Sequence, residues 1–164
     1  LAHHTRPDVL AVDAQRVVGA VADLGLRLVR RLHIGADSAE PEQIHRLFEQ
    51  AFNAADLEGL LALYEPDATL VPQPDVVVEG IDGIRDALRW FLDRKGRITI
   101  DSQLVLRVED LAYLSNRWSL TGGTMPDGSP ADLGATTAEV ARRQADGTWL
   151  YVIDNAWGDR ATTS

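Results

Sequence analysis

The stretch that most constrains the fold is residues 53–92, which reads as helix, short strand, turn, short strand and helix. Asp56 can cap the first helix, whose apolar residues recur at helical spacing. These residues are Leu57, Leu60, Leu61 and Tyr64. Glu65-Pro66 should end this helix, because the residue before a proline is disfavoured in the helical conformation. The stretch therefore indicates a fold that mixes helices with strands.

The remainder of the stretch predicts two short strands and the helix that follows them. Ala68–Val71 should be extended, Pro74-Asp75 should turn, and Val76–Val78 should form a β-branched strand. Asp82 offers a cap for the next helix, which buries one apolar face. Both helices of the stretch thus carry an expected cap and an expected core face.

An earlier helix is predicted to open at Pro41, because proline is tolerated at the first helical position. Its apolar stripe consists of Ile44, Leu47, Phe48, Ala51 and Phe52. His45 lies next to this stripe, and we expect it to be a surface or hydrogen-bonded residue rather than a ligand contact.

The chain after Lys95-Gly96 reads as antiparallel sheet. The expected strands are Arg97–Val108, Ala112–Thr121, Ala131–Ala145 and Thr148–Trp157. Helices first and hairpin-linked strands after them are typical of α+β proteins. We therefore predict three helices after residue 40 that pack on a curved, mostly antiparallel sheet of four to six strands.

Three segments carry a resemblance to a known superfamily: NAADLEGLLALYEPDAT, GIDGIRDAL and the hairpin RRQADGTWLYVIDNAW. Together they resemble the NTF2-like superfamily, most closely its SnoaL-like, DUF4440 (SgcJ/EcaC) branch, and more distantly the ketosteroid isomerases. The resemblance implies a cone whose open end is a pocket. It assigns residues 39–158 to this domain, with 1–38 as an amphipathic, helical N-terminal extension and 159–164 as a tail.

Composition excludes several classes of function. The net charge of −9 argues against nucleic acid or anionic lipid as a partner. The sequence has no cysteine and no apolar run long enough to span a membrane, and we expect a cytoplasmic protein. It contains no portable catalytic or nucleotide-binding motif, and its four histidines lack metal-ligand spacing. We therefore expect neither a metal nor a cofactor.

Comparison with the ketosteroid isomerases implies that most of their catalytic groups are absent. Their general base falls on or near Pro72, and their oxyanion-binding tyrosine falls on Phe48. Their second oxyanion donor, a protonated aspartate, corresponds to Glu139. The resemblance therefore disfavours isomerisation by that mechanism and leaves Glu139 as the one acidic residue at a catalytic position of the ketosteroid isomerases.

The last hairpin gives this acid a partner. A two-residue turn at Asp146-Gly147 places Glu139 directly opposite Asp154, on one face of the sheet. Thr137, Ala141, Val152 and Ala156 share that face and, with Phe48 and Pro72, are the predicted pocket lining. We predict Glu139 and Asp154 as the catalytic residues, with one of the two carboxyls protonated near neutral pH.

The opposite face of the hairpin is expected to be bulky and apolar. It would carry Val140, Trp149, Tyr151, Ile153 and Trp157. A row of this kind favours a homodimer through the sheet face.

Two function classes remain open. One is a cofactor-independent enzyme of isomerase, cyclase, hydratase or hydrolase type, acting in secondary metabolism on a small hydrophobic or carbonyl-containing molecule. The other is a non-catalytic ligand-binding or dimeric association domain. An acid held protonated in an apolar pocket would favour the enzyme.

Overall fold

The computed structural model describes residues 40–158, and the expected extension (1–38) and tail (159–164) lie outside the described residues. The described residues form three helices and a seven-stranded sheet. The helices are α2 (Gln43–Asn53), α3 (Leu57–Leu61) and α4 (Gly80–Leu92). The strands are β1 (Tyr64–Gln73), β2 (Val76–Glu79), β3 (Arg97–Val108), β4 (Leu111–Thr124), β5 (Pro130–Thr136), β6 (Ala138–Arg143) and β7 (Trp149–Asn155).

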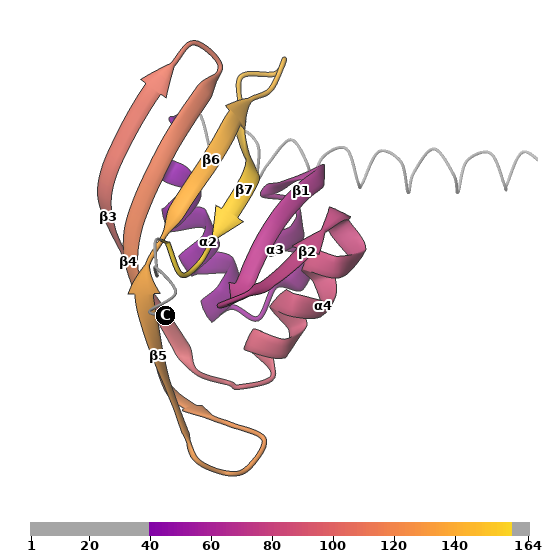
Figure 1. The fold of residues 1–164 in the computed structure, drawn as a ribbon, viewed down its shortest axis with the longest axis vertical. Helices are drawn as coiled ribbons and strands as arrows, with labels where there is room; N and C mark the ends of the chain where they lie inside the picture. Colours follow the sequence, from indigo (N-terminus) through magenta and orange to yellow (C-terminus); the bar gives the residue numbers. More distant parts are fainter. Residues whose placement is uncertain (1–39, 159–164) are drawn as a thin grey trace, which may run out of the picture. The chain divides into compact units, whose positions relative to one another are not determined.

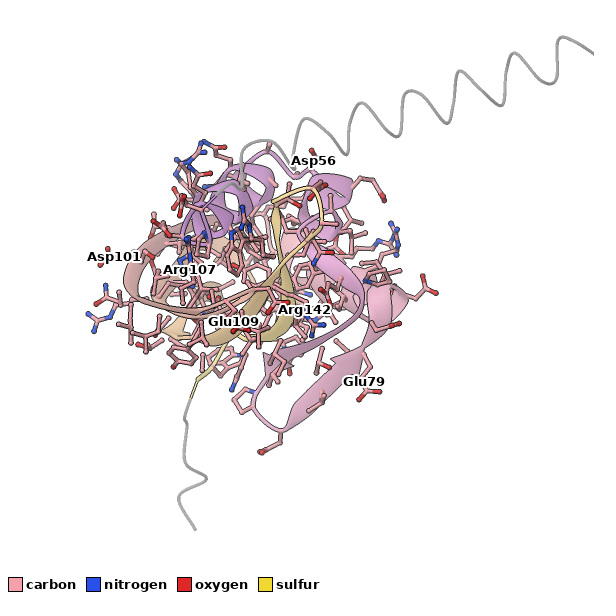
Figure 2. All side chains as sticks on the ribbon, turned by 90° about the horizontal axis from the view of Figure 1, so that it is seen from above. Asp56, Glu79, Asp101, Arg107, Glu109 and Arg142 are labelled. Carbon is pink, nitrogen blue, oxygen red and sulfur yellow. The ribbon has the colours of Figure 1, made fainter. Side chains whose placement is uncertain are left out.

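The strands follow the order β2-β1-β7-β6-β4-β3, and β5 pairs with β4. Only the β1–β7 pair is parallel among the described strands. The long β3 and β4 strands curve across one side of the helices (Figure 1). The two edges of the sheet, marked by Glu79 on β2 and Asp101 on β3, lie on opposite sides of the molecule (Figure 2). The predicted α+β class is confirmed.

The sheet has one strand more than the predicted range allows, because the expected strand Ala131–Ala145 is divided. The division falls at Thr137, which lies opposite Asn116 of β4. The Thr137 backbone N–H donates to the Asn116 carbonyl at 2.8 Å. In return, the Asn116 N–H donates to the Thr137 hydroxyl oxygen rather than to its carbonyl, at 2.9 Å. A side chain thus replaces one backbone acceptor between β5 and β6.

Helix α3 is shorter than predicted, and Tyr64 belongs to β1 instead. The Asp56 cap is confirmed, since its carboxylate accepts from the Gly59 N–H at 2.9 Å. After Leu61 the chain turns, and the Leu63 carbonyl accepts from the Tyr151 N–H at 2.8 Å. Pairing with β7 therefore starts before the proline that was expected to end the helix. Tertiary pairing, rather than the proline, sets the boundary.

The predicted cap at Asp82 is wrong. Helix α4 begins at Gly80, and its N-cap residue is the extended Glu79. Asp82 lies in the first turn, where a negative charge interacts favourably with the helix dipole.

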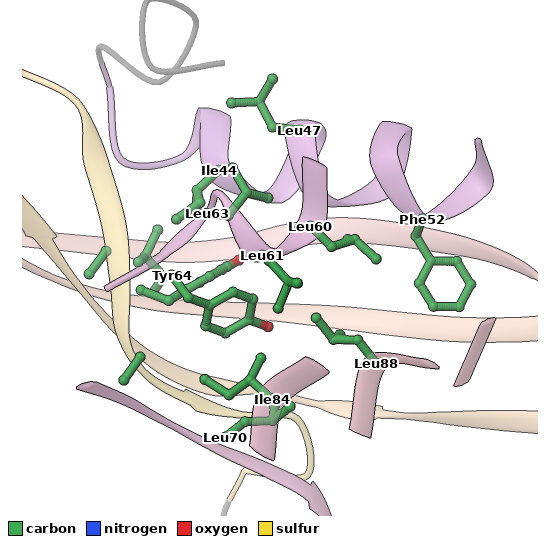
Figure 3. Packing of buried hydrophobic residues seen from close by; sticks show 14 of the residues in the cluster. Ile44, Leu47, Phe52, Leu60, Leu61, Leu63, Tyr64, Leu70, Ile84 and Leu88 are labelled. Carbon is green, nitrogen blue, oxygen red and sulfur yellow. The ribbon is translucent and has the colours of Figure 1, made fainter. Parts of the chain in front are cut away.

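The core lies between the helices and the inner face of the sheet. Helix α2 contributes Ile44, Leu47 and Phe52, and α4 contributes Ile84 and Leu88. Tyr64 lies between the apolar side chains of α3 and those of α4 (Figure 3). A tyrosine predicted on a helix face is thus a central core residue with its hydroxyl inside the protein.

A β-bulge in β7 changes which residues of the last hairpin face inward. Val140 pairs with Ile153, but the next residue, Ala141, pairs with Tyr151. Val152 is therefore an extra residue, which reverses the inward–outward alternation that precedes it. Consequently Trp149 and Tyr151, predicted on the outer face, are each 1% exposed, and Val152 is not on the inner face as predicted.

The outer face of the sheet is nevertheless apolar. Leu106, Tyr113, Val140 and Ile153 are successive cross-strand neighbours on β3, β4, β6 and β7. Leu104, Val108 and Leu111 extend this row along β3 and β4, and all but the half-buried Val140 are exposed. We call these seven residues the outer apolar face. Of the helices that the structure describes, none has both the length and the hydropathy needed to cross a membrane.

Candidate functional site

A cavity of about 60 Å³ lies between the helices and the inner face of the sheet. Its apolar lining consists of Phe48, Phe52, Leu70, Leu88, Phe91, Ile98, Ile100, Trp118, Leu120 and Ala156. Five further residues carry polar side-chain groups: Asn116, Thr137, Glu139, Tyr151 and Asp154. A few polar groups in an apolar enclosure are typical of small-molecule sites.

Glu139 and Asp154 enter this cavity from adjacent strands. They are directly paired in the β6–β7 ladder and are 3% and 6% exposed. The predicted two-residue turn is not the reason, because Gln144 already pairs with Thr148 and Ala141 with Tyr151. The bulge between Val140 and Ala141 then shifts the register by one residue and brings Asp154 opposite Glu139. Side chains paired in this way have Cβ atoms roughly 5 Å apart. The two carboxyl groups are therefore close neighbours in a water-poor space.

Glu139 is held by groups from two other elements. His45 Nε2 on α2 lies 2.6 Å from Glu139 Oε2. The Asn116 amide on β4 donates to Glu139 Oε1 at 3.0 Å. Both carboxyl oxygens of Glu139 therefore have a hydrogen-bond partner.

Asp154 has a different environment. Burial, followed by the nearby negative charge of Glu139, raises the pKa of Asp154 to about 7. Two effects oppose this rise, the hydrogen bond from Tyr64 and the interaction with His45. The Tyr64 hydroxyl donates to Asp154 Oδ2 at 2.5 Å. Asp154 is thus the member of the pair that keeps a proton near neutral pH.

Tyr64 remains a donor throughout the physiological pH range. Burial raises its phenolic pKa well above the usual value, and the neighbouring Asp154 raises it further. A neutral phenol that donates to a carboxyl group polarises it and strengthens the hydrogen bond that the carboxyl can itself donate. Tyr64 thus donates to Asp154, and Asp154, when protonated, can donate to a ligand in the cavity.

His45 connects the cavity to the surface of the protein. Its Nδ1 lies 2.9 Å from the hydroxyl of Ser102 on β3, an exposed residue. His45 itself is 2% exposed. Because a carboxylate can only accept, Nε2 carries the hydrogen toward Glu139. Nδ1 then accepts from Ser102 in the neutral ring and donates to it in the imidazolium.

The predicted pocket lining is only partly brought together. Phe48, Thr137 and Ala156 line the cavity. Ala141, Val152 and Pro72 are not among its lining residues: Ala141 packs in the core, and Val152 is displaced by the bulge. Pro72 is buried, and its carbonyl accepts from the Trp157 indole N–H at 2.8 Å.

Four residues of the site were not predicted from the sequence: Tyr64, His45, Asn116 and Tyr151. Tyr64 was assigned to a helix, and Tyr151 to the outer face. Asn116 carries no motif, although strand parity with the apolar Leu114 and Trp118 could have placed it inward. His45 was expected to be a satisfied residue, and it is one, but its partner is the candidate catalytic acid.

Within residues 40–158, no group of three or more His, Asp or Glu side chains is arranged to hold a metal ion.

Solved structures with the same fold have diverse names. A protein from Streptomyces avermitilis, named as a dehydratase of the NTF2-like family, is 17% identical, with a TM-score of 0.62 over 77% of this chain and 98% of that one. A ketosteroid isomerase-like protein from Erwinia carotovora atroseptica is 20% identical, with a TM-score of 0.60 over 74% and 92%. A protein from Thiobacillus denitrificans, named as a calcium/calmodulin-dependent protein kinase type II association domain, is 21% identical, with a TM-score of 0.60 over 72% and 94%.

No curated protein matches the chain. These structural similarities establish the fold and leave the activity open, because proteins with this fold carry different names. The profile of the SnoaL-like domain matches residues 44–152, a range that includes Glu139 and most of the cavity lining and ends two residues before Asp154. On the strength of that match, the chain belongs to the SnoaL-like domain family, within the NTF2-like fold.

Proposed function

We propose that the protein binds a small carbonyl-containing molecule in the cavity and transfers protons to and from it. The observation that carries this proposal is the pairing of Glu139 with Asp154 in an apolar enclosure, with a different set of polar partners for each. Two carboxyl groups in environments that separate their protonation are the usual arrangement for acid–base catalysis.

Asp154 is the proposed acid. Its Oδ2 accepts from Tyr64, so the carboxyl proton on the other oxygen is free to hydrogen-bond a substrate carbonyl oxygen. As electron density moves onto that oxygen, the proton stabilises it or transfers to it. The geometry thus supplies a neutral acid where a developing oxyanion needs one.

Glu139 is the proposed base. It takes a proton from the carbon next to the carbonyl, while Asp154 gives its proton to the carbonyl oxygen. The products are a neutral enol, a protonated Glu139 and an ionised Asp154, so atoms and charge balance. Return of the Glu139 proton to another carbon, while the enol returns its proton to Asp154, completes an isomerisation. Alternatively, the protonated Glu139 gives its proton to a β-hydroxyl, which leaves as water while the enol returns its proton to Asp154, and this completes a dehydration.

His45 provides the proposed exit for the proton. It bridges Glu139 and the exposed Ser102 through its two ring nitrogens. A protonated Glu139 can pass its proton to His45 only when the ring carries its hydrogen on Nδ1, because Nε2 must then be free to accept it. The imidazolium formed in this way can release its Nδ1 hydrogen toward the Ser102 hydroxyl. The cavity can therefore exchange protons with solvent without opening.

The experiment is a turnover screen with small enones and β-hydroxy ketones, followed by ultraviolet absorbance and proton–deuterium exchange at carbon. Glu139→Gln and Asp154→Asn should each abolish exchange and turnover while the circular dichroism spectrum is kept. Asp132→Asn, an exposed β5 acid, is the matched control and should have no effect. Unchanged exchange in both cavity variants would refute the catalytic role.

The non-catalytic alternative predicts a different result. A protein that only holds its ligand would retain a small molecule in native mass spectrometry and lose it in the same variants, yet exchange no carbon-bound proton. The comparison of binding with exchange therefore separates the two function classes.

We also propose that the protein is a homodimer through the outer apolar face. The argument differs from the one made from the sequence, because Trp149 and Tyr151 are buried in the core. The support comes from cross-strand neighbours on four strands, among which Leu106 is 55% exposed and Tyr113 40%. A face this apolar is unusual on a monomer.

A further inference from the structure

Asn116 carries a buried acceptor beside the cavity. The residue is 2% exposed and lines the cavity beside Glu139 and Thr137. Its side-chain oxygen, Oδ1, has no hydrogen-bond partner among residues 40–158. An unpaired amide oxygen in an apolar enclosure is unfavourable, and few native side chains leave one.

The orientation of this amide is fixed by its neighbours. The amide nitrogen donates to Glu139 Oε1, and a carboxylate cannot donate in return. The backbone N–H of Asn116 is separately held by the Thr137 hydroxyl. Turning the amide over would place two acceptors against each other, so Oδ1 must stay on the side away from Glu139.

The neighbouring groups have their own partners. Asp154, when protonated, is a donor that suits a carbonyl oxygen on the ligand. Glu139 is also an acceptor, but His45 and the Asn116 amide nitrogen already contact its two oxygens. Asn116 Oδ1 can only accept. A ligand that fills the cavity excludes water from this oxygen and must itself supply a hydrogen.

We propose that Asn116 is a specificity residue, which selects ligands that carry a hydroxyl or N–H group for its Oδ1. Together with the proposed function, on which this substrate class rests, the ligand is a hydroxylated carbonyl compound rather than a simple ketone. The hydroxyl lies toward β4 and the carbonyl toward Asp154 on β7.

Two matched probes test the inference: phenol, which can donate a hydrogen bond, and anisole, which carries a methyl group in place of that hydrogen. Their affinities are measured by NMR titration of the full chain. We expect phenol to bind about tenfold more tightly than anisole, because anisole leaves Oδ1 unpaired. The Asn116 side-chain ¹³Cγ resonance should shift with phenol and stay in place with anisole.

Three variants separate Asn116 from its neighbours. Asn116→Leu, of similar shape, should bring the two affinities to within about twofold of each other. Glu139→Gln should keep the preference for phenol, which excludes the carboxylate as the acceptor. Ile98→Val, a change in the apolar lining, should weaken both probes equally.

Equal affinities in the native protein, no binding of either probe, or a preference that persists in Asn116→Leu would each overturn the inference. If Asn116→Leu does not fold, the ¹³Cγ shift in the native protein decides the question. Phenol is not a substrate, so failure of the turnover screen leaves this result unaffected, and failure here leaves the proton-transfer proposal standing.

Discussion

Asp154 links the protonation of the cavity to the stability of the fold. Its pKa is about 7 in the folded protein, against an ordinary value of 3.8. Between these two values the folded state holds a proton that the unfolded state has lost. The free energy of unfolding therefore falls as pH rises from about 4 to 7, with a slope of up to roughly 1.4 kcal/mol per pH unit from this group, and levels off above that window.

Asp154→Asn should remove this dependence. Asparagine keeps a neutral side chain at every pH, so the variant should gain stability relative to the native protein as pH rises from 4 to 7. Urea unfolding at several pH values within that window measures the difference. Asp132→Asn, at an exposed position on β5, should show the native slope. A native slope in Asp154→Asn would contradict the assignment of the proton to this residue.

Tyr64 tunes the same proton. Its hydroxyl donates to Asp154 and favours the ionised carboxylate, so Tyr64→Phe should raise the pKa of Asp154 above about 7. Loss of the buried hydrogen bond should also cost about 1 kcal/mol of stability. A ¹³C titration of the aspartate carboxyls measures the first effect. Tyr113→Phe, on the outer apolar face, is the control and should leave the titration unchanged.

At the scale of an element, the short helix α3 depends on its N-cap residue, Asp56. The Asp56 carboxylate accepts from the Gly59 N–H, and α3 has only five residues to stabilise it otherwise. Asp56→Ala should therefore cost about 1 kcal/mol in thermal or urea unfolding. Asp82→Ala, in the first turn of α4, should cost less because no cap bond is lost. Equal losses of stability in Asp56→Ala and Asp82→Ala would mean that the hydrogen bond from the Gly59 N–H to Asp56 does not stabilise the fold.

The elements were predictable where local signals agree with tertiary pairing. The stripe of α2 and the cap at Asp56 follow from spacing and capping chemistry. The predicted pairing of Glu139 with Asp154 is present, but it depends on the bulge at Val152, which the sequence did not indicate. The errors arise where pairing overrides local signals. Tyr64 joins β1 because β7 lies beside it, and the extra residue Val152 turns Trp149 and Tyr151 inward.

The polar network of the site could not have been derived from the sequence. His45, Asn116 and Tyr64 come from α2, β4 and β1, and only the folded chain brings them to the two carboxyl groups. Each of these three residues is a polar side chain on a face of its helix or strand that is otherwise apolar. A sequence gives the face on which such a group lies, but the partner across the cavity depends on how the elements pack.

At the scale of the whole molecule, the outer apolar face should control assembly. Light scattering at tens of micromolar should give a dimer, and Leu106→Glu should give a monomer because it places a charge between Leu104 and Val108 on the outer apolar face. Val77→Glu, on the exposed part of β2, is the control and should stay dimeric. A native monomer would refute the proposed dimer and leave residues 1–39 or another protein as the cover of this face.

The cavity has a consequence that concerns volume rather than energy. A folded chain that encloses unfilled space occupies more volume than its atoms require, and unfolding eliminates that space. Hydrostatic pressure therefore favours unfolding of this protein. A ligand that fills the space reduces the volume lost on unfolding. Such a ligand should make the unfolding transition less steep in pressure, an effect that is separate from the stability gained by binding itself.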